Sequence, residues 1–191
     1  MTYDGGAGAG LQIPWHYLWY AAAALALMVV AIAGDNLWLL NFVHVFSGLL
    51  WTGIDLFLGF VLGPIMRTLD LPMRRAIAAK LTPRTMFLMP TVSIVAGTTG
   101  WFLAERMGLF GVPWPQFAWV ASSLVLLALM TVVGLGRLLP TNVRVCIELQ
   151  KPEPDMPKVG RWMRRYFFLT AAQGLMQVLT IVVMARFRVG L

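Results

Sequence analysis

Four residues that stand three or four positions apart in one apolar run could do chemistry inside a membrane: His44, Gly48, Trp51 and Asp55. Residues at this spacing share one side of a helix. An ionisable side chain within such a run is costly to bury in lipid, so it marks a candidate functional site. The imidazole of His44 could ligate haem iron or another metal, relay protons, or bond to a neighbouring helix.

We treat His44 as the candidate metal ligand, in the form of an axial ligand to a b-type haem. Gly48 lies one turn away and leaves room for a flat ligand or for another helix. Met176, in the last apolar run, is a candidate second ligand, because thioether sulfur binds haem iron and copper(I). The predicted cofactor site is therefore made of His44, Gly48, Trp51 and Met176.

The same run carries a second ionisable group, Asp55, and the chain has a second histidine, His16. Charged groups inside membranes usually pair with one another. We expect the run to end at Gly63 and Pro64, which places Asp55 near the cytoplasmic end of its helix, on the side of His16. The sequence therefore predicts a buried polar pair of His16 and Asp55, and it separates the two histidines too far to share one haem.

Transmembrane helices must position these residues. The 191-residue chain is 59% hydrophobic and 12% charged, far more apolar than a soluble domain. Several apolar runs reach the roughly 20 residues that cross a bilayer, and a spanning segment must form a helix to satisfy its backbone. We expect an all-α, polytopic transmembrane helical bundle in a single integral membrane domain, residues 1–191. Its five transmembrane helices are expected over residues 14–34, 37–63, 84–105, 115–139 and 166–185.

Loop charges predict the orientation of the bundle. The predicted loops 64–84 and 140–165 carry most of the 15 Lys and Arg residues. The positive-inside rule places these loops in the cytoplasm, with the N-terminus and its flexible tail (residues 1–13), and it places the C-terminus outside. We expect the basic residues to contact anionic lipid headgroups rather than nucleic acid. The expected location is the bacterial inner (cytoplasmic) membrane, as a multi-pass protein.

The run that starts at His44 and ends at Gly63 and Pro64 resembles a pattern in small bacterial multi-spanning proteins. The pattern is a histidine, a few apolar residues, a tryptophan, one residue, a glycine, and then a Gly-Pro helix end. It is similar to that of the copper-resistance D family and of the membrane-type protoporphyrinogen oxidase. The resemblance to the oxidase implies that His44 is a haem ligand. That family also uses a lysine from another helix, whereas the lysines of this chain all lie in predicted loops.

Three functions remain open on this reading. The first is a redox protein that holds one haem b and serves electron transfer or haem-linked redox chemistry. The second is a non-catalytic structural or accessory subunit of a larger membrane complex, whose partners are other membrane proteins. The third is copper(I) transport through His44 and methionines. The sequence does not decide whether the chain is an enzyme, and its single cysteine, Cys146, excludes a disulfide framework.

Overall fold

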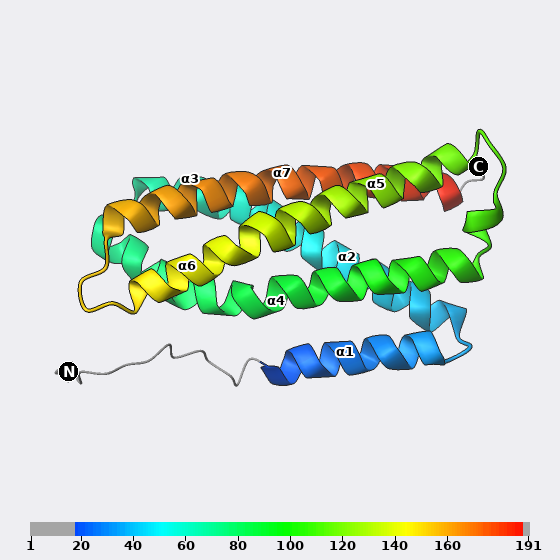
Figure 1. The fold of residues 1–191 in the computed structure, drawn as a ribbon, viewed down its shortest axis with the longest axis horizontal. Helices are drawn as coiled ribbons and strands as arrows, with labels where there is room; N and C mark the ends of the chain where they lie inside the picture. The colour runs from blue at the N-terminus through cyan, green and yellow to red at the C-terminus, as the bar shows by residue number, and fades with distance from the viewer. Residues whose placement is uncertain (1–17, 189–191) are drawn as a thin grey trace.

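A computed structural model describes residues 18–188, and over this range the chain is helical with short connections. The helices run side by side along one long axis (Figure 1). Two segments, η2 and η4, are π-helical, and η3 is a single 3₁₀ turn. The elements are α1 (Leu18–Ala33), α2 (Leu37–Leu56), η2 (Phe57–Leu62), α3 (Gly63–Thr68), α4 (Leu71–Arg106), η3 (Leu109–Gly111), α5 (Phe117–Val133), η4 (Gly134–Leu138), α6 (Leu139–Leu149) and α7 (Met156–Arg188).

Several helices are long and apolar enough to cross a membrane. Within the described residues there are four of them, namely Leu37–Thr68, Leu71–Arg106, Phe117–Leu149 and Met156–Arg186. Helix α1 is a shorter apolar helix. The predicted first span begins at residue 14, outside the described residues. The all-α architecture is confirmed over the described residues, and four of its helices could each cross a membrane, while the fifth span stays a prediction.

The predicted end of the second span at Gly63 and Pro64 is wrong, because the helix continues through both residues to Thr68. Proline in a helix removes one N–H donor, and its ring clashes with the carbonyl four residues earlier. The π-helical segment η2 lies directly before Pro64, and the N–H of Gly63 donates to the carbonyl of Leu58, five residues back. This wider turn gives the proline room, so the chain passes it without a break. The π-helical segment η4 likewise precedes Pro140.

The predicted loops 64–84 and 140–165 are mostly helix. The chain leaves helical structure only briefly between Thr68 and Leu71, and α6 continues to Leu149 before α7 begins at Met156. Helices α4 and α7 each begin directly after an aspartate that caps the helix N-terminus. Asp70 accepts a hydrogen bond from the Met73 amide (3.1 Å), and Asp155 accepts one from the Lys158 amide (2.9 Å).

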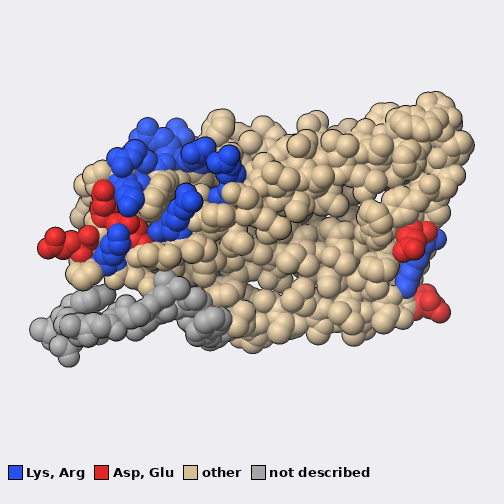
Figure 2. Space-filling model, in the orientation of Figure 1, with Lys and Arg blue, Asp and Glu red and all other residues tan. Residues whose placement is uncertain are grey.

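Charge divides the molecule along its length. Lys and Arg gather at the end where α6 stops and α7 starts, and the long middle of the visible face is free of charge (Figure 2). Glu148 links the end of α6 to the α6–α7 connection and to the start of α7, because its carboxylate binds Lys151 (2.9 Å) and Lys158 (3.3 Å). At the opposite end, the Arg106 guanidinium donates to the backbone carbonyls of Ile32 and Gly34 and so ties the end of α4 to the end of α1. This asymmetry is the charge pattern on which the predicted orientation rests.

Candidate functional site

Asp55 lies deep inside the bundle, toward the middle of its helical run rather than near its end. Because the helical run extends from Leu37 to Thr68, Asp55 is about 27 Å from its start and about 20 Å from its end, at 1.5 Å per residue. A hydrocarbon core of about 30 Å centred on this run would place Asp55 close to the midplane. Its side chain is fully buried, with 0% of the residue exposed. A buried ionisable group in a helical run that is apolar enough to cross a membrane marks a candidate functional site.

Two glutamines of α7 hold the Asp55 carboxyl group. Gln173 Nε2 and Gln177 Nε2 both donate to Asp55 Oδ2, at 3.2 and 3.0 Å, and the Trp51 side chain also hydrogen-bonds the carboxyl group. Both glutamines are themselves buried, with 2% and 4% exposed. A carboxylate oxygen accepts hydrogen bonds, so each amide must turn its nitrogen toward it and its oxygen elsewhere.

This arrangement leaves three buried oxygens without a hydrogen-bond partner: Asp55 Oδ1, Gln173 Oε1 and Gln177 Oε1. Buried polar atoms are nearly always satisfied by protein, water or a ligand, so each exception needs an explanation. All three atoms are acceptors grouped around one carboxyl group. The cluster therefore has an unused capacity to bind hydrogen-bond donors or positive charge.

A second polar group lies beside the first, toward the basic end of the bundle. The Tyr166 hydroxyl hydrogen-bonds Asn142 and Thr85, and Asn142 Nδ2 donates to Thr85 Oγ1 at 3.3 Å. These residues come from α7, α6 and α4, and all three are buried. At this level of the bundle, α4, α6 and α7 therefore contact one another through buried polar side chains.

Both polar groups border one cavity of ≈ 390 Å³ between α4 and the α5–η4 segment. This volume falls within the range that binds small molecules. The wall is mainly apolar and aromatic, and its polar side chains include those of both polar groups together with Ser93, Thr98 and Thr131. Two lining residues, Ile94 and Leu135, are about half exposed on the outer surface, so the cavity reaches the lipid-facing side of the bundle. The lining includes Trp51, Asp55, Ser93, Trp101, Tyr166 and Gln173.

His44 packs against α4 at a glycine. Its Nδ1 lies 3.0 Å from the carbonyl oxygen of Ala96, and since a carbonyl only accepts, Nδ1 carries the proton. Gly100 makes room for the ring, because a Cβ on this glycine would lie 2.7 Å from His44 Cε1. Within residues 18–188 the structure gives Nε2 no partner, so the neutral ring keeps one free lone pair there. His44 does not line the cavity beside Asp55.

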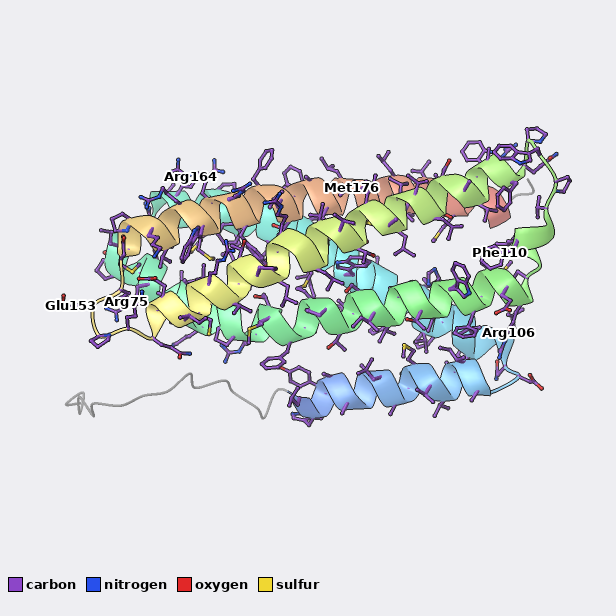
Figure 3. All side chains as sticks on the ribbon, viewed as in Figure 1. Arg75, Arg106, Phe110, Glu153, Arg164 and Met176 are labelled. Atoms are coloured by element: carbon purple, nitrogen blue, oxygen red, sulfur yellow. The ribbon has the colours of Figure 1, made fainter. Side chains whose placement is uncertain are left out.

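The other predicted ligand-site residues separate into two environments. Gly48 faces open space, because a Cβ there would meet no atom within 4 Å. Trp51 is buried with Val92, Ala96 and Met130, and Met176 packs on the same cluster from α7. Figure 3 shows Met176 on α7 where that helix runs beside α5. The structure thus brings together Trp51, Met176 and, through Trp51, the Asp55 carboxyl group.

The predicted pair of His16 and Asp55 cannot be followed in full, because His16 lies outside the described residues. The partners of Asp55 inside the described range are Trp51 and the two glutamines. Among residues 18–188 no group of three or more His, Cys, Asp and Glu side chains is placed to hold a metal ion. A metal at His44 would therefore need ligands of other kinds, such as methionine or a macrocycle.

The glutamine pair is the functional feature that the sequence analysis did not connect to Asp55. Gln173 and Gln177 stand four residues apart, and this spacing places both amides on one helix face. A helix that ended at Gly63 would place Asp55 near its end, and so at a different depth from the two amides. Because the helix ends at Thr68, Asp55 lies at the same level as Gln173 and Gln177.

Comparison of the chain with protein-family models, with curated proteins and with solved structures gives no match, so the candidate site rests on its own geometry.

Proposed function

We propose that this chain is a membrane protein that binds a small, largely apolar molecule inside the bilayer, in the cavity between α4 and the α5–η4 segment. The observation that carries the proposal is the fully buried Asp55, held by two glutamines at the wall of a ≈ 390 Å³ cavity. A mostly apolar pocket with a few converging polar groups is the usual form of a ligand site. The apolar wall supplies affinity and Asp55 fixes the orientation of the ligand.

The surroundings of the cavity support access from the lipid. Ile94 and Leu135 belong both to the cavity wall and to the outer surface of the bundle. A molecule dissolved in the hydrocarbon core could therefore enter sideways, without crossing the charged end of the protein. We further propose the orientation that the loop charges favour, with the basic end in the cytoplasm.

Photolabelling tests the proposed cavity, because it reports which residues a bound molecule touches. The probe is a phenyl(trifluoromethyl)diazirine with a para tert-butyl group, added to purified protein in a non-ionic detergent. We expect mass spectrometry to find labelling at the buried wall residue Met130, and we expect unlabelled tert-butylbenzene to compete with it. Lipid-facing Val125 and Leu129 of α5 should be labelled without competition.

Two phenylalanine substitutions provide a matched test. Ser93→Phe adds a ring to the cavity wall and should reduce the competed labelling roughly tenfold, because the added ring takes the space of the probe. Ser122→Phe adds the same ring on the exposed side of α5 and should leave the labelling unchanged. If every labelled residue faces detergent and none is protected by tert-butylbenzene, the proposed function is wrong.

A second candidate function is haem binding at His44, and one observation favours it. Nδ1 of His44 donates to the Ala96 carbonyl, and a metal-ligating histidine is usually oriented by such a bond from its other nitrogen. Nε2 is the nitrogen that would bind iron, and Gly48 leaves open space one turn away. Haem would occupy space other than the cavity beside Asp55, because His44 does not line that cavity.

A reduced-minus-oxidised absorption spectrum tests this candidate. We expect haem-replete wild-type protein to show a b-type band and His44→Ala to lose it, because the axial nitrogen is removed. His16→Ala is the control, since these are the only two histidines of the chain. A colourless wild-type preparation that is well folded would rule out this candidate and leave the cavity proposal untouched.

A further inference from the structure

We infer that the molecule bound beside Asp55 is a cation, of the class of small aromatic or alkyl ammonium compounds. This inference rests on the proposed function, because it assigns a charge to the molecule that the cavity binds. It depends on the charge balance, the free acceptor atoms and the aromatic wall of the site.

The charge balance around Asp55 is incomplete. Its partners are two amides and an indole, all of them neutral. Among the described residues, the ion pairs of the structure involve Glu148, near the basic end, and none involves Asp55. Acidic groups inside membranes normally pair with a positive charge. A cationic ligand would supply the charge that residues 18–188 do not place there.

The free atoms of the site select the same kind of ligand. Asp55 Oδ1, Gln173 Oε1 and Gln177 Oε1 are all unpartnered acceptors. An anionic ligand would place its negative charge against a carboxyl group and the negative ends of two amide dipoles, which is unfavourable at low dielectric. An ammonium group, in contrast, is attracted by all three oxygens, and two of them belong to residues that line the cavity, Asp55 and Gln173.

The aromatic lining strengthens the preference for a cation. Trp51, Trp101, Phe102 and Tyr166 contribute to the cavity wall, on the same cavity as the carboxyl group. Aromatic faces attract cations within about 6 Å, and combinations of aromatic side chains recognise quaternary ammonium groups. A carboxyl group combined with aromatic walls therefore fits a molecule with one positive charge and an apolar body.

Three probes of nearly equal shape test the charge of the ligand. Each is a phenyl(trifluoromethyl)diazirine, with a para trimethylammonium, tert-butyl or sulfonate group. Labelling at Met130 in the cavity is divided by labelling at exposed Val125, which corrects for different partition into the detergent micelle. We expect the corrected labelling to be strongest for the cation, weaker for the neutral probe and weakest for the anion. The cation should exceed the anion by at least roughly tenfold.

The variant Asp55→Asn should reduce the preference for the cation over the neutral probe by roughly tenfold. Glu105→Gln, which removes an acid at the end of α4, should leave the preference as in the wild type. Equal corrected labelling of the wild-type protein by the three probes overturns the inference even if Asp55→Asn does not fold. A preference for the cation that survives in folded Asp55→Asn also overturns it. If the neutral probe enters the cavity and the cation does not, only the inference fails. If no probe enters, the proposed function fails.

Discussion

Replacing both glutamines that hold Asp55 should destabilise the bundle by about 3–6 kcal/mol, because each hydrogen bond to a charged group contributes about 1.5–3 kcal/mol. Gln173→Leu/Gln177→Leu removes both amide donors to Oδ2 but keeps the carboxyl group in the same apolar surroundings. The midpoint of thermal unfolding in detergent measures the effect. Gln116→Leu is the control, because Gln116 makes no side-chain capping bond at the start of α5.

Adding Asp55→Leu to the double variant should restore most of the lost stability. Replacing every partner of a buried polar group by an apolar side chain is often close to neutral, whereas leaving one partner alone is costly. The triple variant should therefore unfold at a higher temperature than the double variant and lose the preference for the cationic probe. A triple variant as unstable as the double one would show that the glutamines act through packing and not through Asp55.

The positions of the spans could be predicted from the sequence, but their ends could not. Apolar runs long enough to cross a bilayer are visible from residue types alone, and they gave the all-helical architecture. Proline was the misleading signal. Pro64 and Pro140 were expected at or near helix ends, yet each follows a π-helical turn that accommodates its ring, and Pro83 and Pro90 lie inside α4. Whether a helix continues past proline depends on packing around it, which local sequence does not report.

The candidate site, like the spans, could be predicted from the sequence only in part. His44 and Asp55 were recognised as intramembrane ionisable residues from their types and positions. Their partners were not, because a hydrogen bond between α2 and α7 joins residues more than a hundred positions apart. Because the helix continues to Thr68, Asp55 lies toward the middle of the run, at the level of Gln173 and Gln177. The helix boundary thus decides whether Asp55 is expected to meet α7, and the pair with His16 stays a prediction because His16 lies outside the described residues.

Gly59, in η2 directly after α2, lies very close to the backbone of α7. A Cβ on Gly59 would lie 2.5 Å from the Cα of Ala171 and 2.6 Å from its backbone nitrogen, closer than real Cβ contacts. Small residues four apart, here Gly59 and Gly63, let membrane helices approach closely. Gly63 repeats the contact one turn later, where a Cβ would lie 2.9 Å from Phe167 Cβ. The sequence shows that Gly59 and Gly63 are four residues apart, but it does not show that both face α7.

Gly59→Ala should therefore destabilise the bundle by about 1–3 kcal/mol or more, because only backbone movement can relieve the overlap. Gly53→Ala is the matched control on the same helical run, since a Cβ there would meet no atom within 4 Å. It should be neutral or slightly stabilising, as alanine favours helix over glycine. Thermal unfolding of both variants in one detergent measures the difference, and equal midpoints would contradict the close approach at Gly59.

Gly59→Ala should also weaken cation binding, although it touches neither the cavity nor the ligand. Gly59 is one turn beyond Asp55, and Ala171 is two residues before Gln173, so pushing these backbones apart lengthens the bonds that hold the carboxyl group. The corrected labelling by the trimethylammonium probe should fall in Gly59→Ala and remain at the wild-type level in Gly53→Ala. If stability falls while labelling is unchanged, the glycine contact serves packing alone. If both fall together, the close approach of α2 and α7 is what positions Asp55 for its ligand.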